Sequence, residues 1–540
     1  MVFTMRQSYS RVWQGAMACL IAAVGGCYSY KEPAAATFGE SYSQRKIDAA
    51  DDMFKDIKTL TLRDAQRIAI QNNPTYISAY HAVEAARMKY LQAWGAYSPT
   101  INASFDLSAS TNWDLHRTDS HPYHDHPRYQ NVSTSTGVRA SLLIFDGFAR
   151  MFRLKAARSG FDYQARMEED ACRTMMLAVS YAYNTVLLAK ENRRIALEDK
   201  KFQLSSLENT RHKFDAGAAP LSDVLNFEIY VRSADLSLIA ADYQYEVAIY
   251  ALAQLMGYPE GTLPEHVVFP EGYQTEFADL PAVEIYLDAA LANRPDLKAY
   301  REQLNIAKYQ VYQAWGAYSP TVSGFAQWSV DTDDNRNYPR YHWDSVDTTG
   351  FAYGIQASWT VFDGAVRFNQ LREAQASQAV AEYQVAAQWF AVVSEVRTAY
   401  ANYIQNVRQT RLLAEVRQLS ARQRDLVREE YQAGKAELTR LNEAQRDLVE
   451  AETSLASSYI NVQNAKAQLT SVVGGTTAEY YMNNDAVNGR YPGLDGIATA
   501  EQSADSGEAG GQTEPAAAPD VKRSAPASGA PVIPGSASEK

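Results

Sequence analysis

The sequence is poor in cysteine, in basic residues and in catalytic signatures. Cys19, Cys27 and Cys172 are the only cysteines in 540 residues, and their spacing matches neither a zinc site nor a disulfide framework. The 51 Lys and Arg are outnumbered by 63 Asp and Glu, so the basic stripe that nucleic-acid binding requires is missing. There is no P-loop, HExxH, GxSxG or dinucleotide-binding glycine pattern. We therefore expect no enzyme, no cofactor and no nucleic-acid partner.

The apolar run at the N-terminus is too short for a comfortable membrane span. It follows Arg6 and Arg11 and gives way to small residues, which is the pattern of a secretion signal. Its end, Val24-Gly25-Gly26-Cys27, resembles a bacterial lipobox, in which the cysteine is diacylated and becomes the mature N-terminus. We expect residues 1–26 to be a lipoprotein signal peptide and Cys27 to be a lipid anchor. Plain signal cleavage with an incidental Cys27 is the alternative.

Glycine and proline are also missing from two long stretches, 148–213 (apart from Gly160) and 365–430. Each stretch predicts a helix of about 66 residues, which would be about 99 Å long. Both are too charged to lie in lipid, so they should stand in water beside partner helices. The helices that follow carry heptad repeats with one large and one small position, typical of close coiled-coil packing. The repeats are Val224, Val231, Leu238, Tyr245 and Leu252 with Phe227, Ala234, Ala241, Ala248 and Leu255, and then Leu441, Leu448, Leu455, Val462 and Leu469 with Ala444, Ala451, Ser458 and Ala465.

The nonapeptide QAWGAYSPT occurs twice, at 92–100 and, 221 residues later, at 313–321. A second shared motif, FDG, lies at 145–147 and 362–364, an offset of 217, so the first copy has four extra residues in between. The chain is therefore an internal duplication. The expected divisions are a linker at 27–58, a first repeat at 59–256, a connection at 257–280, a second repeat at 281–475 and a disordered Ala/Gly/Ser/Pro-rich tail at 476–540.

Within each copy the hydrophobic period changes from helix to strand. Residues 61–97 and 281–318 are typical of helix, and Pro99 and Pro320 end it. Strict alternation then predicts one long β-hairpin per copy, at about 99–145 and 320–362, with an apolar and a polar face. Trp94 and Tyr97, and Trp315 and Tyr318, mark these helix-to-strand junctions. Their rings suit either a membrane–water interface or packing between helices just below the strands.

Four such strands cannot close a membrane barrel, and open sheet edges are not tolerated in lipid. The chain should therefore assemble: two copies would give eight strands and a plugged interior, and three would give twelve and room for a lumen. A periplasmic coiled-coil scaffold or adaptor without a pore is the alternative, but such a protein would not need two long strand pairs with a polar and an apolar face.

The span from about 60 to 475 resembles the TolC-like outer-membrane efflux proteins. The resemblance rests on the order of the duplicated features: the proline that ends the first helix, the FDG that opens the long helix, and the turns at Gly217 and Gly434. It implies a mixed fold of α-helices and transmembrane β-strands, built from a duplicated helix-strand-strand-helix-helix unit. A homotrimer would form a 12-stranded outer-membrane β-barrel continued by a long α-helical coiled-coil periplasmic tunnel. The implied function is the exit duct of a tripartite efflux or type I secretion system, lipid-anchored in the bacterial outer membrane. Its partners would be a periplasmic adaptor protein and a proton-driven or ABC-type inner-membrane pump.

The same resemblance directs attention to the far ends of the helices. The turns at Gly217, Ala218, Gly434 and Lys435 would dock the adaptor, with positive φ required at both glycines. Asp215, Asp223 and Glu437 would each recur three times at the periplasmic gate, although they could equally be ordinary helix-end carboxylates. His116, His121, His124 and His126 lie in the first hairpin loop; we expect a solvated loop, with metal binding by His121, His124 and His126 as the weaker alternative.

Overall fold

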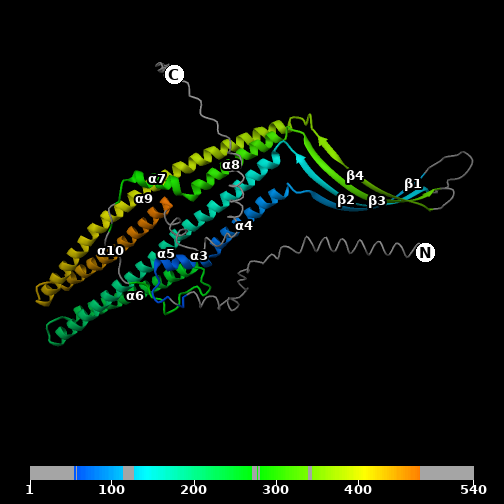
Figure 1. Ribbon diagram of the computed structural model, residues 1–540. Helices are drawn as coiled ribbons and strands as arrows, with labels where there is room; N and C mark the ends of the chain where they lie inside the picture. Colours follow the sequence, from blue (N-terminus) through cyan, green and yellow to red (C-terminus); the bar gives the residue numbers. More distant parts are fainter. Residues whose placement is uncertain are drawn as a thin grey trace, which may run out of the picture. The chain divides into compact units, whose positions relative to one another are not determined.

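The computed structural model describes residues 54–55, 57–113, 127–270, 277, 280–337 and 343–474, all within one structural unit, Met1–Ala478. The described chain runs twice through the same series of helix, helix, strand, strand, helix, helix (Figure 1). The first copy comprises α3 (Leu62–Asn72), α4 (Pro74–Gly95), β1 (Thr100–Trp113), β2 (Pro127–Phe145), α5 (Ala149–Asp215) and α6 (Leu221–Leu255). The second comprises α7 (Val283–Asn293), α8 (Pro295–Gly316), β3 (Thr321–Asn337), β4 (Trp343–Ser358), α9 (Val366–Gln432) and α10 (Leu438–Val473).

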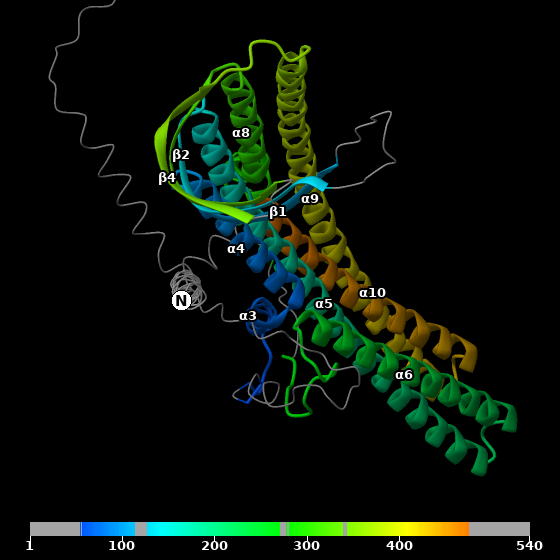
Figure 2. The ribbon, with the colours of Figure 1, turned by 90° about the vertical axis from the view of Figure 1, so that its right-hand side faces the viewer.

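The two long helices confirm the prediction from missing glycine and proline. α5 and α9 each contain 67 residues. Gly160 does not interrupt α5, and a side chain at that position would approach Ile306 of α8 at 4.0 Å. Each long helix turns back at its far end into α6 or α10, and the two helical hairpins run side by side (Figures 1 and 2). None of the described helices combines the length and the apolar character that membrane crossing requires.

The prediction of one helix over 61–97 and one over 281–318 is wrong in detail, because each is broken in two. The breaks lie at Asn73 and Arg294, directly before Pro74 and Pro295. Proline disfavours helical backbone in the residue before it but is well suited to a first helical position. The Asn73 side chain caps α4 by accepting from the backbone N–H of Thr75 at 2.9 Å. The prolines therefore start new helices instead of lying inside old ones.

The strands form one antiparallel sheet in the order β1-β2-β3-β4. The two hairpins have the same register: Thr100 pairs with Ser141, and Thr321 with Ser358. β4 ends at Ser358, so Trp359 and Val361, which the alternation pattern assigned to the strand, lie beyond it. The Trp359 indole instead donates a hydrogen bond to the Tyr318 carbonyl at 3.2 Å.

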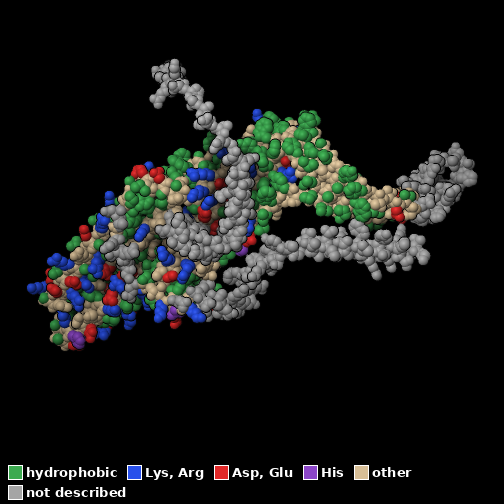
Figure 3. Space-filling view, in the orientation of Figure 1, with side chains coloured by type: hydrophobic (Ala, Val, Ile, Leu, Met, Phe, Trp, Pro, Cys, Tyr) green, Lys and Arg blue, Asp and Glu red, His purple; other side chains and the backbone are tan. Residues whose placement is uncertain are grey.

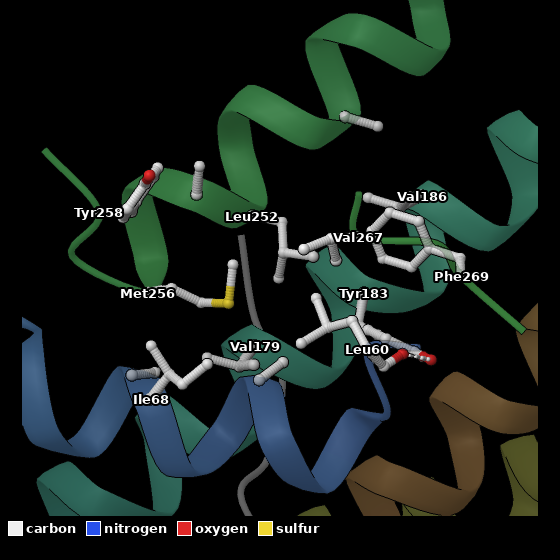
Figure 4. Close-up of a cluster of buried hydrophobic side chains, with 14 of the residues drawn as sticks. Leu60, Ile68, Val179, Tyr183, Val186, Leu252, Met256, Tyr258, Val267 and Phe269 are labelled. Atoms are coloured by element: carbon white, nitrogen blue, oxygen red, sulfur yellow. Dashed lines mark hydrogen bonds between the residues drawn. The ribbon is translucent and has the colours of Figure 1, made fainter. Parts of the chain in front are cut away.

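A hydrophobic core joins α3, α5, α6 and the connection that follows α6 (Figure 4). Leu252 and Val179 are fully buried there, and the Tyr183 hydroxyl donates to the Leu60 carbonyl at 2.9 Å. The predicted heptads are confirmed by burial. Large-position residues such as Val224 and Leu441, and small-position residues such as Ala234 and Ala451, turn toward the neighbouring helices. This core thus fixes α3 and the connection after α6 against the first helical hairpin, α5–α6.

Candidate functional site

The sheet has two chemically different faces. Ile101, Phe105 and Leu107 of β1 stand on one face and are 67%, 68% and 65% exposed, and Phe351, Tyr353 and Ile355 of β4 are equally bare. The alternate positions are small or polar, and Ser135 donates to the Asp331 carboxylate at 2.5 Å across β2 and β3. Figure 3 shows hydrophobic side chains gathered over the strands, whereas charged side chains are spread along the helical hairpins. Such a sheet can present one face to lipid and the other to water.

The FDG motifs turn each hairpin into its long helix. Gly147 and the following Phe148 have φ of 67° and 65°, and Gly364 and Ala365 have 68° and 67°. Two successive left-handed residues are needed to reverse the chain between strand and helix, which explains the glycine. The aspartate caps the new helix: Asp146 Oδ2 accepts from the backbone N–H of Arg150 at 2.8 Å.

An arginine four residues after each FDG aspartate holds the strand-to-helix joint together, and it was not among the residues expected from the sequence. The Arg150 guanidinium donates to the carbonyls of Ala96 at 3.1 Å and Leu143 at 2.8 Å, and lies 4.2 Å from the centroid of the Tyr97 ring. Arg367 repeats this in the second copy, with its guanidinium 5.5 Å from the Tyr318 ring centroid. The signal was present, since FDGFAR and FDGAVR share the arginine.

The aromatic residues of the nonapeptides lie at the junctions, as placed from the sequence. Trp94 and Tyr97 are neighbours with ring centroids 5.8 Å apart, and Trp315 and Tyr318 repeat the distance. Both indoles remain about half exposed in the single chain. Pro99 and Pro320 stand directly before β1 and β3. Whether these rings meet the membrane interface stays a prediction.

The helical hairpins end in two turns of the same form. Gly217 and Gly434 both have φ of 71°. The Ala218 N–H donates to the Lys213 carbonyl at 2.7 Å, and the Lys435 N–H to the Glu430 carbonyl at 2.8 Å. This bonding satisfies carbonyls that a helix end leaves open. The turns therefore offer an exposed, well-defined surface, and adaptor docking there stays a prediction.

The three gate candidates flank these turns. Asp215 is the exposed last residue of α5, Asp223 lies half-buried in the first turn of α6, and Glu437 is the exposed residue that precedes α10. Among the described residues none of the three carboxylates forms an ion pair within the chain.

The two hairpins also contact each other near their tips, through residues that no sequence pattern pairs. The Phe202 ring of α5 has Arg424 and Arg428 of α9 over it at 5.4 and 5.8 Å, and the Lys213 ammonium lies 4.6 Å from the Tyr431 ring centroid. These residues are more than 200 positions apart in the chain, so no local pattern could pair them. Cation–ring contacts of this kind hold the hairpins together close to the candidate gate.

Several predicted sites lie outside the described residues: the lipid anchor Cys27 and the histidines His116, His121, His124 and His126. Within the part of the chain that the structure describes, no group of His, Cys, Asp and Glu is arranged to hold a metal ion.

Comparisons with known proteins agree with this architecture. The family model for outer membrane efflux proteins matches residues 66–258 and 286–475, once for each copy and together more than half of the chain. The alkaline protease secretion protein AprF of Pseudomonas aeruginosa is 23% identical over 348 residues, covering 64% of this chain and 70% of AprF. The outer membrane protein TolC of Escherichia coli K12 is 23% identical over 296 residues, covering 53% of this chain and 58% of TolC.

Solved structures share the fold. The CmeC outer membrane channel of Campylobacter jejuni superimposes with a TM-score of 0.65 at 16% identity, covering 80% of this chain and 90% of CmeC. The open-state MtrE channel of Neisseria gonorrhoeae gives 0.61 at 21% identity, covering 77% and 89%. The family match and the curated relatives favour a channel over the alternative of a scaffold without a pore. The chain belongs to the outer membrane efflux protein family, whose duplicated helix-strand-strand-helix-helix fold it has, and it is an outer-membrane exit duct for export.

Proposed function

We propose that the chain works as a homotrimer, with three sheets closed into a 12-stranded barrel and three pairs of helical hairpins continuing it as a periplasmic tunnel. The observation that carries this proposal is the sheet: four strands with one apolar and one polar face and, among the described residues, open edges at β1 and β4. An unpaired edge in lipid leaves backbone groups without hydrogen-bond partners, so other copies must complete the sheet.

The long helices set the length of the duct. A helix of 67 residues is about 100 Å long at 1.5 Å per residue, and α5 and α9 both have this length. Their charged surfaces suit water. The duct would conduct passively, because no cofactor is expected and the chain carries none of the common catalytic signatures.

The partners are a periplasmic adaptor and an inner-membrane pump. Docking is assigned to the turns at Gly217, Ala218, Gly434 and Lys435, which are the parts of the hairpins farthest from the sheet. Asp215, Asp223 and Glu437 beside them are assigned to the gate. Because the docking turns and the gate carboxylates are neighbours, adaptor docking at the turns would be coupled to opening of the gate.

The lipid anchor at Cys27 completes the proposal for the outer membrane. Labelling with radioactive palmitate in a Gram-negative host tests it: the wild-type protein should incorporate label and Cys27→Ser should not. Equal labelling of both proteins would refute lipidation at this residue without affecting the channel.

Planar-bilayer recording of the purified protein tests the channel. Stable conductance from a preparation whose mass in detergent corresponds to three chains is the expected result. A monomer that passes no ions would overturn the proposal. Small molecules and proteins are the two candidate classes of transported substrate. The similarity to AprF, a protein named for protease secretion, makes a type I secretion substrate worth testing by complementation of a strain that lacks its secretion duct.

A further inference from the structure

The polar face of the sheet carries an ordered pattern of charge. Residues that pair across the four strands lie in rows, and every second row points to the polar face. The exposed apolar side chains of Ile101, Phe105 and Leu107 stand on the opposite face. If that apolar face meets lipid, the polar rows line the lumen of the proposed barrel.

Three successive rows of this lumenal face differ in charge. Counted from the helical end outward, they are Asn102, Arg139, Gln327 and Ala352, then Ser104, Gly137, Ser329 and Gly350, then Asp106, Ser135, Asp331 and Thr348. Asp333 stands in the row that follows. We call Arg139 the basic belt and the set Asp106, Asp331 and Asp333 the acidic belt.

Arg139 presents a full positive charge to the lumen. Its guanidinium lies over the Phe325 ring, 5.0 Å from the centroid, and the side chain is exposed. A ring attracts the cation without cancelling its charge, because the ring has no net charge. Among the described residues Arg139 forms no ion pair, and no other lumenal position in the rows from Thr100 to Ser110 is basic.

The acidic belt is held on the wall by hydroxyl groups. The Asp331 carboxylate accepts from Ser135 Oγ at 2.5 Å and from Ser329 Oγ at 3.2 Å. Asp106 and Asp333 are exposed. None of the three carboxylates forms an ion pair with a described residue, so the belt faces the lumen as a group of like charges.

The two belts are far enough apart to act separately on a passing ion. Arg139 and the row of Asp331 are four residues apart along the strands, which is about 13 Å. The Debye length is about 8 Å at physiological ionic strength, so the belts largely do not cancel each other. The row between them is small-sided, and a Cβ on Gly137 would already meet the Trp328 carbonyl oxygen at 3.2 Å.

The field of each belt would reach the centre of the lumen at moderate salt. Twelve strands spaced about 4.8 Å apart and tilted by about 40° give a backbone-to-backbone diameter of about 24 Å. The axis is then about 12 Å from the wall backbone and nearer to the side chains. The Debye length is about 10 Å in 0.1 M salt and about 3 Å in 1 M salt. Selectivity from the belts should therefore depend strongly on salt.

We infer that Arg139 is a specificity-determining residue of the duct. In the proposed trimer, on which this inference rests, three Arg139 guanidinium groups favour anions at the inner end of the barrel, and the acidic belt favours cations at its outer end. Cargo that carries carboxylate or phosphate groups would pass the basic belt more readily than cationic cargo.

The order of the belts also makes conduction asymmetric. When the outer side is positive, anions enter past Arg139 and cations enter past the acidic belt, so both kinds of ion gather between the belts and the conductance rises. With the opposite polarity both kinds are drawn out of this zone and the conductance falls. The current should therefore be larger with the outer side positive.

Ion selectivity in planar bilayers tests the basic belt. The parent is Asp215→Asn/Asp223→Asn/Glu437→Gln, in which the gate candidates are neutral and barrel charges dominate the comparison. Under a KCl gradient around 0.1 M, adding Arg139→Gln should lower the chloride-to-potassium permeability ratio at least about twofold. Arg139→Lys should keep the parent ratio, because it keeps the charge. A role in barrel structure alone would not separate these two variants.

The acidic belt should act with the opposite sign. Adding Asp106→Asn/Asp331→Asn/Asp333→Asn to the same parent should raise the chloride-to-potassium ratio at least about twofold. Asp347→Asn is the matched control, because Asp347 lies on the apolar face of the same sheet, where its carboxylate accepts from Thr332 at 2.8 Å. It should leave the ratio unchanged. Loss of either belt, or 1 M salt, should abolish the asymmetry of the current.

The outcomes separate this inference from the proposed duct. Trimers of Arg139→Gln that conduct with the parent's permeability ratio, or that shift no more than Asp347→Asn, would overturn the role of Arg139 and leave the duct intact. Wild-type trimers that pass no ions would overturn the duct and the inference together.

Discussion

Single side chains hold the strand-to-helix joints, and Arg150 is the clearest example. Its guanidinium bonds to two carbonyls from different elements and stacks on Tyr97. Replacing it with alanine removes both hydrogen bonds and the ring contact, which should cost about 2 kcal/mol. We expect Arg150→Ala to lower the apparent melting temperature of the purified protein by several degrees. Arg150→Lys should recover only part of the loss, since lysine lacks the planar fork.

Arg153 provides a matched control for that measurement, because it lies one turn further along α5 and is exposed. Arg153→Ala should melt within about one degree of the wild type, as surface substitutions usually change stability by about 0.5 kcal/mol or less. An equal drop in melting temperature for both variants would contradict the role of Arg150 in holding the strand-to-helix joint.

Cys172 is a free, buried cysteine, and its thiol should be unreactive in the native protein. Burial raises the pKa of its thiol to about 12, helped by the nearby carboxylates of Glu168 and Glu169. At pH 8 its thiolate fraction should be about 10⁻⁴, against roughly a quarter for an ordinary thiol. We expect maleimide to label Cys172 only after unfolding, as read by mass spectrometry of the peptide. Labelling within minutes in the native protein would contradict the buried placement.

At the scale of elements, the two helix breaks are built from different chemistry. Asn73 caps α4 with a neutral side chain, whereas at the break before α8 the buried Arg294 guanidinium donates to Asp296 at 2.5 Å and also binds Glu395. Removing one partner of a buried ion pair is strongly destabilising, by about 3 kcal/mol or more. Asp296→Asn should therefore lower stability far more than Thr75→Ala, its exposed equivalent in the first copy.

Protonation of the Asp296 carboxyl in acid should destabilise the folded protein in the same way as Asp296→Asn. Burial favours protonation of Asp296, but the hydrogen bonds and charge of Arg294 outweigh it and hold the carboxyl pKa below its ordinary value of 3.8. The folded pKa is thus lower than the unfolded one, so the stabilisation is complete above pH 3.8 and is lost as the pH falls through the folded pKa. The difference in melting temperature between wild type and Asp296→Asn should persist from neutral pH to about pH 4 and shrink below that.

The elements that could be predicted are those whose signal is local. Missing glycine and proline revealed α5 and α9, and strict alternation revealed all four strands. The break at Asn73 was missed because proline can either interrupt a helix or begin one, and the choice depends on the tertiary contact of Asn73 with the Leu255 carbonyl. The β2–β3 register was likewise out of reach, since no short turn joins these strands. The same holds for the contacts of Phe202 with α9, which bridge distant parts of the chain.

At the scale of the whole molecule, the tips combine two opposing influences on the gate. The cation–ring contacts of Phe202 and Tyr431 hold the hairpins together within a chain. Asp215, Asp223 and Glu437 beside them would bring nine carboxylates to the threefold axis of the proposed trimer. Like charges gathered in a narrow opening repel one another and attract cations. The gate would then be held shut by contacts within each chain and tuned by ions between chains.

This predicts that multivalent cations block the duct from its helical end and that the carboxylates are responsible. In planar bilayers the triple variant Asp215→Asn/Asp223→Asn/Glu437→Gln should need at least tenfold more trivalent cation for half-block than the wild type, because neutral amides bind such ions weakly. Glu198→Gln, on the exposed flank of α5 where Glu198 pairs with Lys201 at 2.8 Å, is the control and should leave the block unchanged. Block of the triple variant at the wild-type concentration would show that these residues are helix-end carboxylates with no part in the gate, because cations held elsewhere in the duct would then account for the effect.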